Sequence, residues 1–512
     1  MTLAGDTLAR WQFGLTTVYH YFFVPLTIGL AAITAGLETA WVRTNRDKYF
    51  HATKFWGKLF LVNIAIGVVT GIVQEFQFGL NWSAYSKFVG DVFGAPLAME
   101  ALLAFFFEST FIGLWIFGWD KLPKAVHCAC MWIVSIGTIL SSYFILAANS
   151  WMQHPVGYKV DPATGKAQLT DIAAVLFQET TVVVVFHTLA AAALSAGALV
   201  VGISALHLLR TSRLQRKNKE TNPKSVATMR TSLRVGLIVS AVGGLVTALS
   251  GDSLGKVMFV QQPMKMAAAE ALWETEGPAP FSIFAIGDVR TGHNVVDFQL
   301  PGLLSFLAHS DFTSPVPGIN DTAAAEAAAY GGTPAEYLPA VIVAYWGFRI
   351  MIGVGMTSFG VAMAGLYLTR NKLWVAKRFR TREDQAPRLM VTNKIELPFW
   401  ISQWVWRGAL LTLAFPLIAN SAGWIFTEMG RQPWVVFGLM RTSDAVSPGV
   451  TVAEQAITVI GFAVLYVILA VIEVRLLARF ANAGPDTTEL PPGVQSATDD
   501  PEAARTTPAF AY

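Results

Sequence analysis

Nine long apolar segments constrain this 512-residue chain more than any other feature of its sequence. About 20 consecutive apolar residues are enough to cross the hydrocarbon core of a bilayer as a helix. Only 14% of the residues are charged, against about 25% in an average soluble protein. The sequence therefore predicts an all-α polytopic membrane protein with nine transmembrane helices, at residues 14–41, 56–80, 94–118, 126–150, 182–207, 231–250, 340–369, 397–429 and 451–478.

The apolar segments divide the chain into four parts. We expect six transmembrane helices in residues 1–250, a long loop at 251–339, three further helices in 340–480, and a tail at 481–512. The tail is rich in Pro, Thr, Asp and Gly and cannot bury a core, so we expect it to be disordered. The loop contains PMKMAAAEALWE, which we expect to form an amphipathic helix. The first apolar segment lacks a clear cleavage site and is expected to remain as a signal anchor.

Lysine and arginine are concentrated in alternate loops, including the runs RTSRLQRKNK and RNKLWVAKRFRTR. Cytoplasmic loops of membrane proteins collect these residues. The pattern predicts an outside N-terminus, a cytoplasmic C-terminus and an exterior 251–339 loop. The formal net charge of +3 is too small to favour nucleic acid as a partner. Cys128 and Cys130 match neither a disulfide framework nor a zinc site, so we expect them to be packing residues.

Two of the eight histidines, His20 and His187, lie well within the apolar segments. Ionisable groups at such depth are costly and favour a functional interpretation. One alternative is a hydrogen bond to a neighbouring helix, and the other is ligation of a metal or haem. The remaining histidines lie in loops or at segment ends, where we expect them at surfaces or interfaces: His51, His127, His154, His207, His293 and His309.

The predicted orientation gives each intramembrane residue a depth, at 1.5 Å of rise per residue. Five candidate ligands then fall in the same outer half of the membrane: His20, Glu100, His187, Met351 and Glu428. One thioether near one imidazole is typical of a six-coordinate, electron-transferring haem, although Met351 alone would be ordinary core. Arg349 favours the haem, because a guanidinium among apolar residues needs a fixed anion such as a haem propionate.

Carboxylates form a second group of candidates. Glu100 and Glu108 are eight residues apart, hence about 12 Å along a helix and some 80° around it. This spacing suits a proton relay, since a purely structural pair of buried acids would be costly. Near the end of the eighth segment, Glu428 and Arg431 follow Trp424, and the alternative there is an interfacial salt bridge within an aromatic belt.

Seven segments occur along the chain in an order that resembles subunit I of the cytochrome bd-type quinol oxidases, over roughly residues 5 to 480. They are TTVYHYFFVPLTIGL, WGKLFLVNIAIGVVTGIVQEFQFGLNWS, GAPLAMEALLAFFFESTF, LAANSWMQHP, QQPMKMAAAEALWE, GFRIMIG and AGWIFTEMGRQPW. The resemblance implies a multi-pass subunit of the bacterial cell membrane, paired with a homologous subunit II and with small accessory subunits. It also implies two b-type haems, one low-spin and one high-spin, and one haem d.

The resemblance also assigns roles to residues by motif. His187 and Met351 would ligate the low-spin b haem, whereas His20, Glu100 and Glu428 would serve the two high-spin haems. Which high-spin haem occupies which position stays open, because members of the family differ. Residues around the haems or on the electron path would be Arg349, Trp424 and Arg431.

The exterior loop resembles the family's quinol loop. Lys265 and Glu270 stand where residues implicated in quinol oxidation are found. Only PVPGINDTAAAEAAAYGGTP occupies the segment where long-loop members carry an insertion, so the chain resembles the short-loop group.

The implied reaction oxidises membrane quinol at the outer face and reduces dioxygen to water. Protons would come from the cytoplasm past Glu108 and Glu100, which generates a proton motive force without pumping. A haem–copper oxidase would need several more intramembrane histidines. A secondary transporter would explain the buried acids but not the His/Met pair, and a purely structural subunit would have no need of these costly groups.

Overall fold

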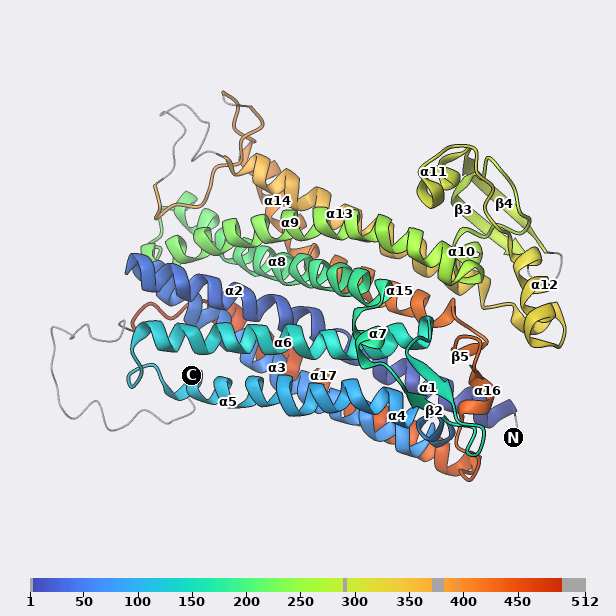
Figure 1. The fold of residues 1–512 in the computed structure, drawn as a ribbon. Coiled ribbons are helices and arrows are strands. Elements are labelled where there is room, and N and C mark those ends of the chain that lie inside the picture. The colour runs from blue at the N-terminus through green and yellow to red at the C-terminus, as the bar shows by residue number, and fades with distance from the viewer. Residues whose placement is uncertain (1–2, 289–291, 371–381, 393, 490–512) are drawn as a thin grey trace.

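Long helices run side by side through the structure, a computed structural model that describes residues 3–288, 292–370, 382–392 and 394–489 (Figure 1). Within these ranges, nine helical spans are long and apolar enough to cross a membrane: Asp6–Thr44, Asp47–Leu80, Ser83–Phe117, Lys124–Gln153, Glu179–Arg216, Pro223–Gln261, Pro334–Leu368, Phe399–Met429 and Val452–Ala483. The prediction of nine spans is confirmed. Most spans are longer than their apolar segments, because the helices continue into polar sequence. The predicted disordered tail lies, from residue 490 onward, outside the described residues.

Single helices form six of the spans. They are α3 (Asp47–Leu80), α6 (Lys124–Gln153), α8 (Glu179–Arg216), α9 (Pro223–Gln261), α13 (Val341–Leu368) and α17 (Val452–Ala483). A short 3-10 turn, η2 (Pro334–Tyr337), precedes α13 in its span.

The other three spans are interrupted. The first is α1 (Leu3–His20) and α2 (Phe23–Thr44), and the eighth is α14 (Phe399–Leu411) and α15 (Phe415–Met429). The third consists of α4 (Ser83–Met99), the π-helical segment η1 (Glu100–Ala104) and α5 (Phe105–Phe117). Such π-helical turns are rare and are often found at functional sites. Two interruptions fall at predicted ligands, since His20 ends α1 and Glu100 begins η1.

The centre of the bundle is α8, of whose apolar window 83% is buried. It packs against α9 and α2, and α2 packs in turn on α3 and α6. By contrast, α13, α17 and the α4–α5 span bury only 11% of theirs. These rim helices expose large apolar side chains such as Leu102, Phe106, Ile460 and Val467. Exposed apolar surface of this kind is what a membrane helix presents to lipid.

A buried polar network joins α2, α5 and α6. The carboxylate of Glu38 accepts a 2.7 Å hydrogen bond from Trp115 Nε1 and lies 2.6 Å from His127 Nδ1. The Nε2 atom of His127 lies 2.8 Å from the Trp115 carbonyl oxygen. A surface or interface position was expected for His127 and for His51, and both are buried. That expectation was wrong because helical packing continues past the ends of the apolar segments.

The 251–339 loop is folded rather than open. It contains α10 (Pro263–Glu270), α11 (Leu303–His309), α12 (Ile319–Tyr330) and an antiparallel hairpin of β3 (Phe281–Asp288) and β4 (His293–Leu300). The sequence analysis did not predict the hairpin. The helix at α10 is confirmed but its amphipathic character is not, because every side chain from Met264 to Glu270 is buried against α9, α12 and α13.

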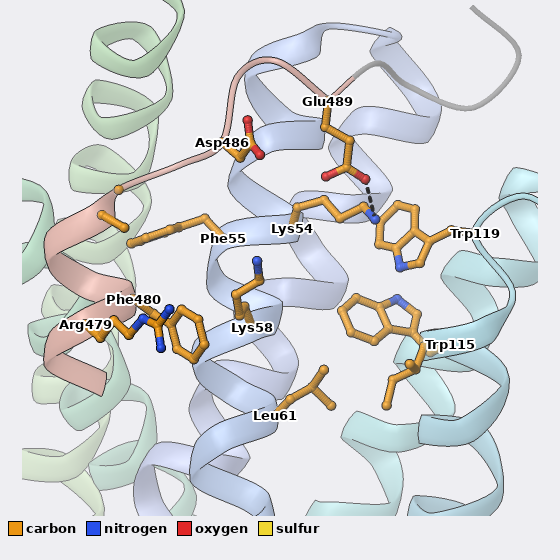
Figure 2. Close-up of a pocket in the computed structure, with 13 residues that line it drawn as sticks. Lys54, Phe55, Lys58, Leu61, Trp115, Trp119, Arg479, Phe480, Asp486 and Glu489 are labelled. Carbon is orange, nitrogen blue, oxygen red and sulfur yellow. Dashed lines mark ion pairs between the residues drawn. The ribbon is translucent and has the colours of Figure 1, made fainter. Parts of the chain in front are cut away.

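Shorter elements complete the fold. They are α7 (Ile172–Phe177), α16 (Thr442–Ala445) and two small antiparallel hairpins, β1 (Tyr158–Val160) with β2 (Ala167–Leu169) and β5 (Trp434–Val436) with β6 (Met440–Arg441). Together with α1 and the 251–339 loop, these elements lie at one end of the bundle (Figure 1). An ion pair between Lys54, early in α3, and Glu489 places the end of the described chain at the opposite end (Figure 2).

Candidate functional site

Two intramembrane histidines are held by hydroxyl groups of neighbouring helices. His20 Nδ1 lies 2.9 Å from Thr70 Oγ1 on α3, and His187 Nδ1 lies 3.2 Å from Ser250 Oγ on α9. Each hydroxyl also lies within hydrogen-bond distance of a backbone carbonyl one turn earlier, and donation to that carbonyl favours acceptance of the Nδ1 proton by the hydroxyl oxygen. In that tautomer the lone pair of each ring is on Nε2. A metal-ligating histidine has this arrangement, with one ring nitrogen hydrogen-bonded and the other directed at the metal.

A glycine on a neighbouring helix lies against each histidine and against Met351. A Cβ atom at Gly71 would lie 3.3 Å from His20 Cε1, and one at Gly251 would lie 3.2 Å from His187 Cε1. A Cβ atom at Gly423 would lie 2.7 Å from the Met351 sulfur. The three pairs are Gly71 with His20, Gly251 with His187, and Gly423 with Met351. A methyl group at any of these three glycines would crowd the histidine or methionine beside it.

Glu428 and Arg431, at the end of α15, form an ion pair. Asn149 Nδ2 on α6 donates a 3.0 Å hydrogen bond to the other Glu428 oxygen. Arg431 is only 3% exposed, yet its Nε and Nη1 atoms have no hydrogen-bond partner among the described residues. The indole Nε1 of Trp424 is likewise buried without a partner, while its ring stacks on Tyr21 at 5.2 Å.

These unpaired donors test whether the residues suit a haem. A buried donor without an acceptor costs about 1–3 kcal/mol, so each of these N–H groups is expected to have a partner in the working protein. An anionic carboxylate, such as a porphyrin propionate, accepts from a guanidinium in charge-assisted geometry. Together with the available imidazole nitrogens and a thioether, the residues present fit a haem group.

Helix α6 contacts three of the predicted carboxylates in order along its length. Asn149 binds Glu428, Ser141 Oγ donates a 2.8 Å hydrogen bond to Glu100, and a Cβ at Gly137 would lie 2.9 Å from Glu108 Cγ. These α6 positions are separated by about 12 Å and about 6 Å along the helix axis. Glu428, Glu100 and Glu108 therefore form a row along α6, from near its Gln153 end toward its Lys124 end.

The ionisable residues of α10 are both buried. Glu270, 3% exposed, forms a 2.5 Å ion pair with Arg349 Nη2, and Arg349 Nε donates a 2.7 Å hydrogen bond to the Ser282 carbonyl oxygen. The fixed anion expected for Arg349 is thus supplied by the protein itself. Lys265, 2% exposed, donates a hydrogen bond to Gln153 Oε1 at the end of α6.

Burial brings both α10 residues into the range of neutral pH. It lowers the pKa of Lys265 to about 7, helped by the nearby Arg431 and opposed by Glu428. It raises the pKa of Glu270 to about 7, although the paired Arg349 opposes the shift. Groups with pKa values near the working pH are the most effective general acids and bases.

A small cavity of about 40 Å³ adjoins the end of α10, between Ala271, Gly287 and Tyr345. It holds two or three waters at most and is too small for an aromatic head group, since a cavity that binds benzene measures about 150 Å³. A larger ligand at this position would require α10 or the β3–β4 hairpin to move.

The predicted ligands are distributed singly over separate helices. Among the described residues, no three His, Cys, Asp or Glu side chains gather in a way that could hold a metal ion. This distribution suits a large planar cofactor held between helices rather than a metal ion caged by side chains. The Glu38–His127 network was not predicted, although Glu38 is an acid inside the first apolar segment.

Comparison with known proteins resolves the family. The family described as cytochrome bd terminal oxidase subunit I matches residues 8–485. The chain belongs to this family. The resemblance found in the sequence is confirmed, and the protein is a multi-pass bacterial membrane protein whose family carries haem.

Individual relatives match over nearly their whole length. Cytochrome bd ubiquinol oxidase subunit 1 of Bacillus subtilis (strain 168) is 43% identical over 480 residues, which cover 94% of each chain. Cytochrome bd-II ubiquinol oxidase subunit 1 of Escherichia coli (strain K12) is 34% identical and covers 94% of this chain and 97% of its own. The solved bd oxidase of Geobacillus thermodenitrificans has a TM-score of 0.77 at 25% identity, and covers 94% of this chain and 99% of that one.

Proposed function

We propose that this chain is the haem-bearing subunit of a membrane quinol:oxygen oxidoreductase. The observation that carries the proposal is the pair of intramembrane histidines that each have a hydroxyl of a neighbouring helix at Nδ1, an arrangement that favours a free lone pair on Nε2. Family membership over residues 8–485 supports the same function. Haem iron, when bound, supplies the transfer of electrons and the reduction of dioxygen.

His187 and Met351 would hold a low-spin b haem, because imidazole and thioether together suit a haem that transfers electrons. His20, Glu100 and Glu428 serve a high-spin b haem and a haem d, with the division between these two left open. Arg431 and Trp424, whose N–H groups have no partner among the described residues, would donate them to the carboxylates of a haem. Arg349 holds Glu270 in place from the helix that bears Met351.

Quinol oxidation is proposed at α10, in the 251–339 loop. Ionised Glu270 accepts a proton from the quinol hydroxyl, and neutral Lys265 accepts or shares the second, because both pKa values lie near 7. The loop shares its end of the bundle with α1, and the concentration of Lys and Arg in the loops of the other end favours a cytoplasmic position for that end. The released protons therefore leave on the outer side.

Protons for water formation are proposed to reach the site from the cytoplasm along α6, past Glu108 and then Glu100. Consumption of protons inside and release outside generates a proton motive force without pumping. In this scheme residues 1–250 and 340–480 hold the haems and residues 251–339 bind quinol. The partners are a homologous subunit II, small accessory subunits, quinol, dioxygen and the lipid bilayer; nucleic acid is not a partner.

The test is a reduced-minus-oxidised absorption spectrum of the purified complex, compared between the parent and His187→Ala. The parent should show b- and d-type bands, and the variant should lose the low-spin b signal while the others remain. His207→Ala serves as the matched control on the same helix, because His207 binds the Ala481 carbonyl oxygen and no proposed ligand. A parent complex without haem would overturn the proposal.

A further inference from the structure

The β3–β4 hairpin lies on the α13 side of the bundle, at the end that also holds α10 (Figure 1). Cross-strand partners share a face of a two-stranded ribbon, and successive pairs alternate between its two faces. One face of this hairpin therefore carries three pairs of apolar residues: Phe281 with Leu300, Phe284 with Phe298, and Ile286 with Val296. Five of these six side chains are exposed, from 36% for Val296 to 64% for Phe298. None of the six is charged.

The opposite face of the hairpin attaches it to α10 and α13. Ser282 Oγ, on β3, lies 3.1 Å from the Tyr345 hydroxyl on α13. Asn294 Oδ1, on β4, accepts a 2.9 Å hydrogen bond from Trp273 Nε1, shortly after α10. Ser282 is 2% exposed, and Ala285 on the same face is 1% exposed. These contacts fix which face of the hairpin is turned outward.

The outward face of the hairpin is the reverse of what water favours. An antiparallel sheet with one solvated face normally buries its apolar side chains and turns its polar ones to water. Here Ser282 and Asn294 make contacts with the bundle, whereas Phe284 and Phe298 are exposed. A contiguous exposed apolar surface of this kind marks contact with another protein or with a membrane.

The apolar face of the hairpin continues onto the lipid-facing side of α13. The Phe284 ring packs edge-on against Trp346 of α13, with 5.2 Å between the ring centres. Ile342 and Ile350, one turn before and one turn after Trp346, are 54% and 39% exposed on the same side of the helix. Only 11% of the apolar window of this span is buried, and such side chains face acyl chains. Tryptophan is enriched at the membrane–water interface, so the bilayer extends to the level of Phe284.

We propose that the apolar face of the β3–β4 hairpin inserts into the bilayer leaflet at this end of the bundle. That leaflet is the outer one in the orientation proposed above. The occupant of the face is the glycerol and upper acyl-chain region of phospholipids, because the face is aliphatic and aromatic and is continuous with the lipid-facing side of α13. Segments that bind a bilayer through an apolar face bury it about 5–10 Å into the boundary between head groups and acyl chains. The insertion depends on neither haem binding nor quinol oxidation.

The test is fluorescence quenching of the purified oxidase complex in phosphatidylcholine nanodiscs. A bimane label attached through Phe298→Cys reports from the apolar face. The matched control is Ala163→Cys, an exposed position in the turn between β1 and β2 at the same end of the bundle. Both variants also carry Cys128→Ala and Cys130→Ala, so that only the introduced thiol reacts.

Lipid with a doxyl group high on its acyl chain should quench the label at position 298, and dissolved iodide should leave it bright. The control label should show the opposite pattern. Iodide quenching at position 298 as strong as at position 163 would place the face in water and overturn the proposal. Protection from both quenchers would mean that protein covers the face, which would overturn it as well.

A second measurement uses the parent complex and stays informative if the cysteine variants do not assemble. Nanodiscs contain phosphatidylcholine with a diazirine high on the acyl chain, and peptide mass spectrometry locates the lipid adducts after illumination. Adducts should occur on β3, β4 and α13 and be absent from β1 and β2. Ile286→Ser with Phe298→Ser should lower the hairpin adducts and leave those on α13 unchanged. Labelling of α13 without the hairpin, or unchanged hairpin adducts in this variant, would contradict the insertion.

Discussion

The Met351 sulfur lies so close to Gly423 that a single added methyl group tests its proposed role as a ligand. In Gly423→Ala, the new Cβ would lie 2.7 Å from the sulfur and 3.2 Å from Met351 Cγ. Favourable contact requires about 3.5–4.0 Å, so the thioether must retreat by about 1 Å. Metal–ligand distances tolerate only about 0.2 Å. We therefore expect loss of the Met351–iron bond and conversion of the low-spin b haem to high-spin.

Stability should change less than ligation in this variant. Overpacking costs about 1–3 kcal/mol, but methionine is flexible and replacement of glycine by alanine within a helix recovers about 0.5–1 kcal/mol. The assay is the reduced-minus-oxidised spectrum together with the thermal unfolding midpoint. The control is Gly353→Ala on α13, two residues from Met351, where a Cβ meets no atom within 4 Å. A low-spin signal in Gly423→Ala as strong as that in the control would refute the assignment of Met351.

Four further outcomes are expected. Met351→Leu should lose the low-spin signal while packing costs less than about 1.5 kcal/mol, and an unchanged spectrum with normal quinol oxidation would make Met351 ordinary core. Lys265→Ala and Glu270→Ala should each slow quinol oxidation by about 100-fold or more with haem spectra intact. Because burial raises the Glu270 pKa to about 7, against Arg349 and with the help of Asp297, and lowers the Lys265 pKa to about 7, both base forms and the parental rate should increase from about pH 6 to pH 8, and Glu270→Gln should make the increase shallower by leaving only the contribution of Lys265. Glu108→Gln should slow oxygen reduction with all haems retained, whereas Glu100→Ala should alter a high-spin haem; full turnover in Glu108→Gln would exclude an obligatory relay.

The nine spans could be predicted because the length of an apolar run is a local property of sequence. The pairing of Arg349 with Glu270 could not, since the partners are 79 residues apart and meet only after α10 packs on α13. The same packing explains why the amphipathic character predicted for α10 was wrong. The alanines at 267–269 are small enough to allow close contact on every side of the helix, and a hydrophobic pattern does not report such contact.

The β3–β4 hairpin shows a different limit. Its strands pair from Phe281↔Leu300 to Asp288↔His293 with two irregularities in register. Several of its apolar side chains are exposed, including Val295 and Phe298. Alternation between buried apolar and exposed polar residues is the main signal for a half-buried strand. A hairpin with apolar residues on both faces lacks that signal.

The largest difference between sequence and structure concerns the geometry of Glu100 and Glu108. In a regular α-helix, residues eight apart point about 80° away from each other. The π-helical segment Glu100–Ala104 absorbs one extra residue between them. The pair is then equivalent in direction to residues seven apart, which differ by only about 20°. Accordingly, both side chains face α6, where Ser141 and Gly137 lie one turn apart. The interruption of the helix therefore places the two carboxylates in line with Glu428, which is the order that stepwise movement of a proton along α6 requires.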